Sequence, residues 1–345
     1  MKKTNPYSLT FGKEPVCVIP RTIQINTVCD MFMAENPPQQ IYMITGVKGA
    51  GKTVFMSEIQ KTLAKQDNWI TVELNPAKDL LVSLAAKLYN DQKLTALFKN
   101  AKINLSFYGI GVEISNTDPI TDIETALTRM LETLKKKKKR ILITIDEVTS
   151  TENMKIFASA YQIFVRNDLP VFLLMTGLYE NIHALQNEDM LTFLYRAPKI
   201  TLGSLNISSI AENYRQEFDL GAKPSLEMAK LTRGYPFAFQ VLGYYTFENG
   251  GNFKKALSSY RAYLEDYVYE KMWSELSAND RKVMHAIANS DTGKISDIRQ
   301  DLSMESNEFS PYRDRLIKRG LLNGDKHGYV SFTLPLFEDF TIANY

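Results

Sequence analysis

The sequence predicts an α/β protein, with a parallel sheet over about residues 41–203 and helices in most of the remainder. Short apolar runs alternate with helical patterns in the first region, which is typical of parallel strands joined by crossover helices. After residue 205 consecutive helical patterns replace the strand-like runs. The predicted strands cover residues 41–45, 69–74, 141–145, 170–175 and 199–203.

The composition is that of an ordinary globular protein and gives no general attraction to nucleic acid. The 345 residues are 44% hydrophobic and 23% charged, with a formal net charge of +2. This length predicts two or three domains. Cys17 and Cys29 are too few for a disulfide framework or a metal site. The longest apolar run, 169–175, is too short to span a bilayer, and the basic N-terminus lacks a signal peptide's apolar stretch, so we expect a cytoplasmic protein without a membrane partner.

A phosphate-binding loop follows the first predicted strand. Residues 46–53 read GVKGAGKT, the spacing of a P-loop. Glycines allow successive backbone N–H groups to face one anion, and the start of the next helix adds its positive end. Lys52 would reach the β- and γ-phosphates, and the Thr53 hydroxyl would bind Mg²⁺. The residues expected to bind nucleotide here are Gly46, Val47, Lys48, Gly49, Ala50, Gly51, Lys52, Thr53 and Val54.

Two carboxylates follow the third predicted strand, and they indicate hydrolysis of the bound nucleotide. Asp146 is expected to hold Mg²⁺, usually through water, and Glu147 to orient or deprotonate the attacking water. With Lys52, they predict a Mg²⁺-dependent ATPase that converts ATP to ADP and phosphate. The chain has neither the protein-kinase motif set nor the Asn/Thr-Lys-x-Asp motif with which GTPases read guanine.

Two further residues are candidates for the same chemistry. The fourth predicted strand ends near Thr176, which would lie between the acidic strand and the P-loop strand, so Thr176 is the candidate sensor of the γ-phosphate. Arg196 precedes the last strand and could stabilise charge on the transferred phosphoryl group, in cis or across a subunit interface. A plain surface arginine is the alternative.

An inserted segment separates the second and third strands. Residues 103–114 alternate apolar and polar side chains around Gly109 and Gly111, which predicts a hairpin. A capping box formed by Thr121 and Glu124 then predicts a helix. That helix ends in the basic run 135–140, which we interpret as a solvated helix end in preference to a nucleic-acid or nuclear-localisation signal.

The last third of the chain predicts a helical lid and a terminal module. A capping box at Ser277 and Asp280 starts a helix to Ala288, and two more helices follow. A ribbon turning at 324–328 completes the pattern of a winged helix-turn-helix. The lid helices are predicted near 208–219, 225–233, 236–248 and 252–275, and the domains at 1–205 (P-loop core with its lead-in), 206–275 (lid) and 276–345 (winged helix).

With these motifs in order, the chain resembles the P-loop ATPases of the AAA+/STAND group. It looks closest to prokaryotic ATPases related to initiator proteins, which carry a nucleotide domain, a helical lid and a C-terminal winged helix. The resemblance implies ATP and Mg²⁺ as cofactors. In that group a Gly-x-Pro in the lid contacts the adenine end of the nucleotide, which would be Gly234 and Pro236 in TRGYPFAF. A basic residue upstream of the first strand commonly lies near the base, and Arg21 matches it.

The sequence departs from the family pattern at two positions. Thr176 stands where AAA+ proteins commonly have asparagine, which leaves the hydrolysis rate open. Arg233 precedes the Gly-x-Pro, but nothing in the sequence directs it at the nucleotide as a sensor arginine, which leaves ring assembly open.

The third helix of the terminal module is the candidate DNA-binding element. It is expected within 306–319, with Ser310 and Pro311 at its start. Lys326 would add a contact from the wing. The alternative is a module that packs inside the chain and keeps the nucleotide domain closed. The residues that would contact DNA are Arg313, Arg315, Lys318 and Arg319.

The sequence therefore predicts an ATP-driven molecular switch reset by hydrolysis at Glu147. Two alternatives stay open at this point. One is a DNA-binding regulator or loader tuned by ATP, and the other is a nucleotide-binding scaffold with little hydrolysis. A nucleotide-dependent homo-oligomer or a protein client is a further candidate partner.

Overall fold

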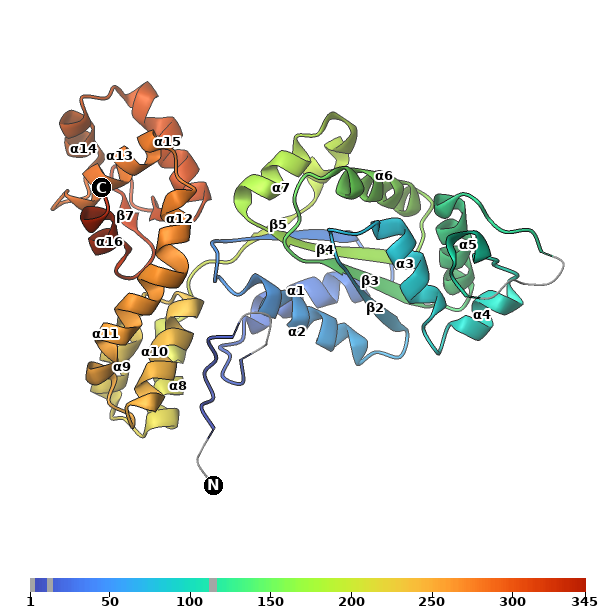
Figure 1. The fold of residues 1–345 in the computed structure, drawn as a ribbon, viewed down its shortest axis with the longest axis horizontal. Helices are drawn as coiled ribbons and strands as arrows, with labels where there is room; N and C mark the ends of the chain where they lie inside the picture. Colours follow the sequence, from blue (N-terminus) through green and yellow to red (C-terminus); the bar gives the residue numbers. More distant parts are fainter. Residues whose placement is uncertain (1–3, 11–14, 112–116) are drawn as a thin grey trace. The chain divides into compact units, whose positions relative to one another are not determined.

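The computed structural model describes residues 4–10, 15–111 and 117–345, and the chain forms two compact units (Figure 1). The sheet unit consists of Thr22–Thr45 and Lys52–Thr201. The helical unit consists of Met1–Arg21, Gly46–Gly51 and Leu202–Tyr345. Each unit therefore draws on separate stretches of the sequence.

Five parallel strands form the sheet, in the order β2-β3-β4-β1-β5 (Figure 1). The α/β fold class and the five predicted strands of the sheet are thereby confirmed. β4 lies between β3 and β1, as the sequence argument about Thr176 assumed. The strands are β1 (Ile41–Thr45), β2 (Trp69–Leu74), β3 (Arg140–Ile145), β4 (Val171–Gly177) and β5 (Lys199–Thr201).

Helices cover both faces of this sheet. Phe32 of α1 packs its ring against Tyr42 of β1 and Phe172 of β4, so α1 covers one face, while α3 and α6 cover the other (Figure 1). The helices of this unit are α1 (Thr22–Met33), α2 (Lys52–Ala64), α3 (Leu80–Tyr89), α4 (Thr95–Asn100), η1 (Ser106–Tyr108), α5 (Ile123–Lys136), α6 (Glu152–Arg166), α7 (Tyr179–Gln186) and η2 (Asp189–Arg196).

The segment between β2 and β3 differs from the sequence prediction. Residues 103–111 contain one turn of 3₁₀ helix, η1, where a hairpin strand was expected, and the rest of the expected hairpin, 112–114, lies outside the described residues. The cap of α5 is also shifted by one residue. Asp122, not Thr121, is its N-cap, because the Asp122 carboxylate accepts the Thr125 N–H at 2.7 Å.

The helical unit begins with four helices in the predicted places, and α11 runs on through a π-helical turn, η3, into α12. Its lead-in segment, residues 4–10 and 15–21, packs on α8 and α10. The Tyr7 ring stacks on Phe218, and the Tyr7 hydroxyl donates to Asn213 Oδ1 at 2.8 Å. The elements are α8 (Ile207–Phe218), α9 (Ala222–Lys230), α10 (Pro236–Glu248), α11 (Phe253–Leu264), η3 (Glu265–Tyr269) and α12 (Glu270–Ser274).

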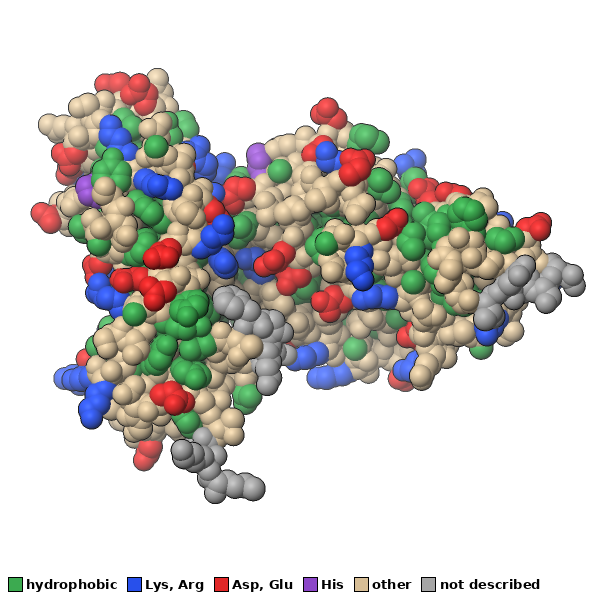
Figure 2. Space-filling model, viewed as in Figure 1, with side chains coloured by type: hydrophobic (Ala, Val, Ile, Leu, Met, Phe, Trp, Pro, Cys, Tyr) green, Lys and Arg blue, Asp and Glu red, His purple; other side chains and the backbone are tan. Residues whose placement is uncertain are grey.

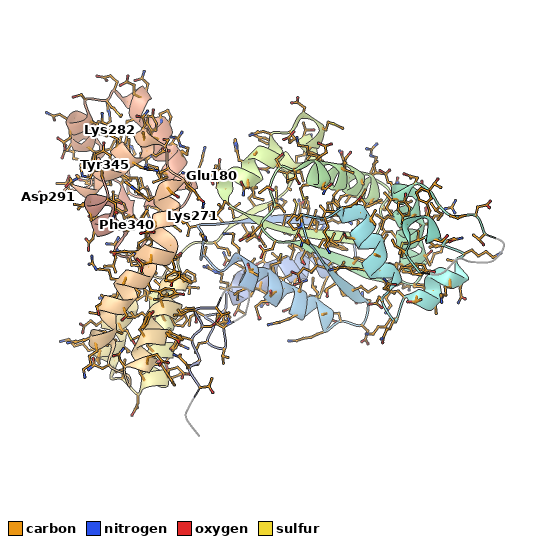
Figure 3. The ribbon with its side chains drawn as sticks, viewed as in Figure 1. Glu180, Lys271, Lys282, Asp291, Phe340 and Tyr345 are labelled. Atoms are coloured by element: carbon orange, nitrogen blue, oxygen red, sulfur yellow. The ribbon has the colours of Figure 1, made fainter. Side chains whose placement is uncertain are left out.

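The C-terminal module contains helices and one short antiparallel ribbon, β6–β7. Phe340 of α16 packs edge-on to Trp273, and Tyr345 stacks on His285. Phe340 and Tyr345 are labelled in Figure 3. Acidic and basic side chains are interspersed on the face of this module that Figure 2 shows. Its elements are α13 (Ala278–Ala288), α14 (Ile295–Leu302), α15 (Ser306–Lys318), β6 (Leu322–Asn323), β7 (Ser331–Phe332) and α16 (Phe337–Ala343).

The start of α15 corrects a second cap prediction. A capping box formed by Glu305 and Glu308 starts this helix, so Ser310 and Pro311 lie inside it. The earlier start satisfies the first N–H groups of α15, and Pro311 merely lacks the N–H that would bond one turn back. The predicted capping box of Ser277 and Asp280, in contrast, is present at α13.

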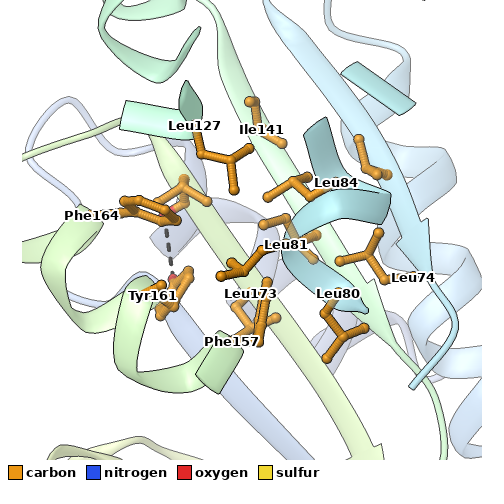
Figure 4. Packing of buried hydrophobic residues seen from close by; sticks show 14 of the residues in the cluster. Leu74, Leu80, Leu81, Leu84, Leu127, Ile141, Phe157, Tyr161, Phe164 and Leu173 are labelled. Carbon is orange, nitrogen blue, oxygen red and sulfur yellow. Dashed lines mark hydrogen bonds between the residues drawn. The ribbon is translucent and has the colours of Figure 1, made fainter. Parts of the chain in front are cut away.

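One extensive apolar core lies between the sheet and the helices α3, α5 and α6 (Figure 4). Leu81 and Leu84 of α3 face Leu173 of β4, and Leu127 of α5 closes the same core (Figure 4). All residues of β4 are buried. Burial on both faces explains why the central strands read as continuous apolar runs without alternation.

Candidate functional site

Asp146 links the ends of two neighbouring elements in the sheet unit. Thr53 Oγ1, in the first turn of α2, donates to Asp146 Oδ2 at 2.6 Å, and Thr176 Oγ1, at the end of β4, donates to Asp146 Oδ1. The Thr176 contact arises because β3 and β4 are adjacent and parallel, so their carboxyl ends lie at one edge of the sheet. The structure therefore brings three of the predicted site residues together.

Glu147 has an uncommon backbone conformation. Its φ of +53° lies in the left-handed region, where residues other than glycine are rare. Residues with such strained backbone conformations are concentrated at functional sites. Its N–H donates to Thr176 Oγ1 at 3.2 Å and to Asp146 Oδ1 at 3.0 Å. This turn ends β3 sharply and leaves the Glu147 side chain exposed.

Lys52 is the first residue of α2 and lies in the field of both carboxylates. Burial lowers the pKa of its ammonium group, while the charges of Asp146 and Glu147 raise it. The carboxylates thus favour the charged form of Lys52, which is the form that attracts a phosphate. Val54 follows in the first turn of the same helix.

The loop Gly46–Gly51 belongs to the helical unit. Gly49 and Gly51 have φ of +76° and +84°, which only glycine adopts without strain. The Ala50 N–H donates to the Val47 carbonyl at 3.1 Å, which closes a turn in the middle of the loop. The predicted glycines thus occur where the backbone requires them.

The lid motif lies beside this loop. A Cβ placed on Gly51 would be 4.0 Å from Pro236 Cβ, and Pro236 is the first residue of α10. Gly234 has a φ of +75° in the turn before α10. Between them, Tyr235 donates its hydroxyl hydrogen to the Lys48 carbonyl at 2.6 Å, a contact that the sequence analysis missed. The middle position of the Gly-x-Pro motif was the one signal that could have pointed to it.

Known structures share the fold of this chain. Residues 21–184 match the family model of an ATPase domain predominantly from Archaea. The chain is similar in structure to the Walker-type ATPase PABY2304 of Pyrococcus abyssi, with a TM-score of 0.67, 15% identity and coverage of 94% of this chain and 96% of that chain. It has the fold of a P-loop ATPase.

A second structure of this fold is the ORC2 protein of Aeropyrum pernix in its ADPNP–ADP complexes. Its TM-score is 0.61 at 13% identity, with 97% of this chain and 95% of that chain covered. Residues 266–341 match a domain of unknown function (DUF8462). No curated protein sequence matches the chain. Within the described ranges, no helix of this P-loop ATPase fold is both long and apolar enough to cross a membrane.

The three arginines considered for the nucleotide site lie in different settings. Arg21 donates to the Gly203 carbonyl at 2.5 Å, and burial lowers the pKa of its guanidinium group. Arg196 is exposed at the end of η2. Arg233 donates to the Phe332 carbonyl at 3.2 Å, so this lid arginine is engaged by the C-terminal module.

The residues expected to contact DNA are partly used inside the C-terminal module. Arg315 donates to Asp280 Oδ1 through Nε at 3.2 Å and Nη2 at 2.5 Å. Arg313 pairs with Asp314 at 3.1 Å. Burial lowers the pKa of Arg319, Lys318 is exposed at the end of α15, and Lys326 Nζ lies 3.7 Å from the Tyr329 ring centroid.

Proposed function

We propose that this protein binds ATP with Mg²⁺ and hydrolyses it as a molecular switch. The observation that carries the proposal is the pair of hydroxyl groups, Thr53 Oγ1 and Thr176 Oγ1, that both donate to the Asp146 carboxylate. This arrangement joins the P-loop helix, the acidic strand and the strand between it and β1. The match of residues 21–184 to an archaeal ATPase domain supports the same assignment.

Thr53 and Asp146 are the proposed Mg²⁺ residues. Both offer oxygen atoms, the ligand type that Mg²⁺ prefers, and their 2.6 Å contact supports the proposal of one site that uses both side chains. Bound Mg²⁺ would neutralise charge on the β- and γ-phosphates. Lys52 adds a fixed positive charge to the same phosphates, and residues 46–54 supply the surrounding backbone N–H groups.

Glu147 is the proposed general base, or the residue that orients the attacking water. Its exposed carboxylate leaves it accessible to water and substrate. The Thr176 hydroxyl is fully buried and contacts both Asp146 and the Glu147 N–H, which supports a role in positioning these two residues. At the other end of the nucleotide, Arg21, Gly234 and Pro236 are proposed to contact the adenine.

Arg196 is proposed to stabilise charge on the transferred phosphoryl group. Its exposure on η2 fits action across an interface between two copies of the chain as well as action in cis. We would measure the mass of the Glu147→Gln variant with and without ATP. A nucleotide-dependent oligomer supports action in trans, and a monomer at all ATP concentrations contradicts it.

Turnover measurements test the proposed hydrolysis. We expect Glu147→Gln to lower ATP turnover by about 100-fold or more while ATP still binds, because loss of general acid–base catalysis costs about 10²–10⁴-fold. Glu132→Gln, an exposed acid on α5, is the matched control and should leave turnover unchanged. If Glu147→Gln turns over like wild type, the assignment fails.

The module α13–α15 with β6–β7 is proposed to be a winged helix that packs inside the chain in preference to reading DNA. The Arg315–Asp280 contacts support this choice, because Arg315 is already engaged by a buried carboxylate. We expect DNA retention to be weak and equal for wild type and Lys326→Glu at 50 mM and 200 mM salt, concentrations over which phosphate contacts lose affinity steeply. Tight, salt-dependent binding that Lys326→Glu abolishes would instead support the DNA-binding regulator.

A further inference from the structure

Tyr235 connects the lid to the phosphate-binding loop within the helical unit. It precedes α10, its side chain is 3% exposed, and its hydroxyl donates to the Lys48 carbonyl at 2.6 Å. Lys48 is the third residue of the P-loop motif. The buried Tyr235 hydroxyl therefore contacts a backbone carbonyl that is 187 residues away in the sequence, in the loop to which the nucleotide would bind.

The turn that carries Tyr235 is fixed by its own hydrogen bonds. The Tyr235 N–H donates to the Thr232 carbonyl at 2.8 Å, and the Leu205 N–H donates to the Gly234 carbonyl at 2.7 Å. A Cβ on Gly234 would come within 2.5 Å of the Leu205 carbonyl oxygen. These contacts thus fix the position of the Tyr235 backbone, from which its side chain reaches the loop.

The Tyr235 hydroxyl acts as a donor to the loop. Burial raises the pKa of Tyr235 well above its ordinary value, so the phenol stays protonated, and a carbonyl oxygen can only accept. Its partner, the Lys48 carbonyl, belongs to the peptide bond between Lys48 and Gly49. In a planar trans peptide the N–H points opposite to the C=O, so a donor fixing the Lys48 carbonyl also fixes the direction of the Gly49 N–H.

We propose that Tyr235 is a positioning residue that turns the Lys48–Gly49 peptide so that the Gly49 N–H faces the phosphates. This proposal rests on the proposed ATP binding, because a P-loop binds phosphate through inward-facing N–H groups. With the Lys48 carbonyl held by Tyr235, the N–H of the same peptide is directed to the opposite side, toward the anion. The lid thereby completes the set of donors in the loop.

The residue at position 49 is matched to this contact. A Cβ on Gly49 would overlap the Tyr235 hydroxyl and lie 2.9 Å from Phe237 Cβ, and the φ of Gly49 is +76°. Glycine is therefore required both by the backbone conformation and by the approach of the lid side chain. The pairing of Gly49 with Tyr235 makes the loop geometry depend on the lid.

The test compares Tyr235→Phe with wild type and with Tyr263→Phe. The first change keeps the ring and removes only the hydroxyl group, and Tyr263 is a control because, within the described residues, its hydroxyl has no hydrogen-bond partner. We expect Tyr235→Phe to weaken MgATP binding by about 3- to 10-fold, the worth of one hydrogen bond. AMP, which lacks the β- and γ-phosphates, should bind all three proteins equally.

The Gly49 amide signal, observed by NMR with ¹⁵N-labelled glycine, separates positioning from stability. In wild type and Tyr263→Phe this signal should shift strongly on addition of MgATP, and in Tyr235→Phe the shift should shrink. A Tyr235→Phe protein that melts earlier but keeps the wild-type ATP affinity and Gly49 shift overturns the proposal. If wild type and Lys52→Ala alike fail to bind ATP, the proposed function is overturned together with this inference.

Discussion

Arg315 of α15 and Asp280 of α13 form a fork of two hydrogen bonds, with Arg315 Nη2 2.5 Å and Nε 3.2 Å from the same carboxylate oxygen. The other carboxylate oxygen of Asp280 accepts the Ser277 hydroxyl at 2.7 Å. Asp280 is only 2% exposed. One buried side chain therefore completes the capping box of α13 and joins this helix to α15.

We predict that Asp280→Ala destabilises the protein by about 2.5–4 kcal/mol, because it removes half of the capping box of α13, worth about 1 kcal/mol, and the charge-assisted hydrogen bonds of Arg315, worth about 1.5–3 kcal/mol. Chemical denaturation measures the loss. Asp301→Ala, an exposed acid on α14, should stay within about 0.5 kcal/mol of wild type. Equal stability of the two variants would contradict the structural role of the fork.

Thr176→Val should lower ATP turnover by about 10- to 100-fold with ATP affinity nearly unchanged, because small misplacements of catalytic groups cost about 10²-fold. The valine leaves Asp146 without one donor and the Glu147 N–H without one acceptor. Thr176→Ser keeps the hydroxyl and should retain most of the activity. The measurements are steady-state turnover and equilibrium ATP binding. A fully active Thr176→Val protein would contradict the proposed positioning role of Thr176.

Gly320→Ala should weaken ATP binding, whereas Gly328→Ala should not. Both glycines have positive φ, +76° and +79°, so both variants bear a similar backbone strain of about 1–2 kcal/mol. A Cβ at Gly320 would come 2.9 Å from Val47 Cγ1 of the P-loop, while a Cβ at Gly328 would meet open space among the described residues. Equilibrium ATP titrations measure the affinities of the two variants. Equal affinities would show that the contact between position 320 and Val47 has no effect on the loop.

Cys29 should resist thiol reagents in the folded protein. Burial, followed by the charge of Asp30, raises the pKa of its thiol to about 11, so the thiolate is scarce at pH 8. Since the folded pKa is raised, this thiol contributes stability that is complete below pH 9 and is lost as the pH rises through about 11. Reaction with a disulfide reagent at pH 8 should be slow in buffer and fast in urea. Equal rates in both would show that the thiol is accessible.

The sheet could be predicted from the sequence because its strands are buried runs that end at recognisable motifs. Asp146 and Thr176 follow from the same logic, since adjacent strand ends bring their polar residues together. The N-cap of α5 could not, because Thr121 and Asp122 are neighbouring residues that both suit a cap.

The contacts between distant segments were also beyond the sequence analysis. The Tyr235–Lys48 hydrogen bond joins a side chain to a carbonyl oxygen, and carbonyl groups carry no residue-specific signal. The engagement of Arg315 by Asp280 depends likewise on how α13 packs on α15. The number of charges along α15 predicted Arg315 to be an exposed cation, because such a count contains no information on the packing of α13.

The lead-in segment has a consequence for synthesis. Tyr7 and Ser8 are synthesised before their partners Asn213 and Gln240, which follow 206 and 232 residues later. A Cβ at Gly243 would overlap the Tyr7 ring, so α10 is shaped around a side chain made long before it. The helical unit is thus a discontinuous domain that cannot close before its segment from residue 202 onward is made, and a fragment without Tyr7 would leave the space of its ring unfilled.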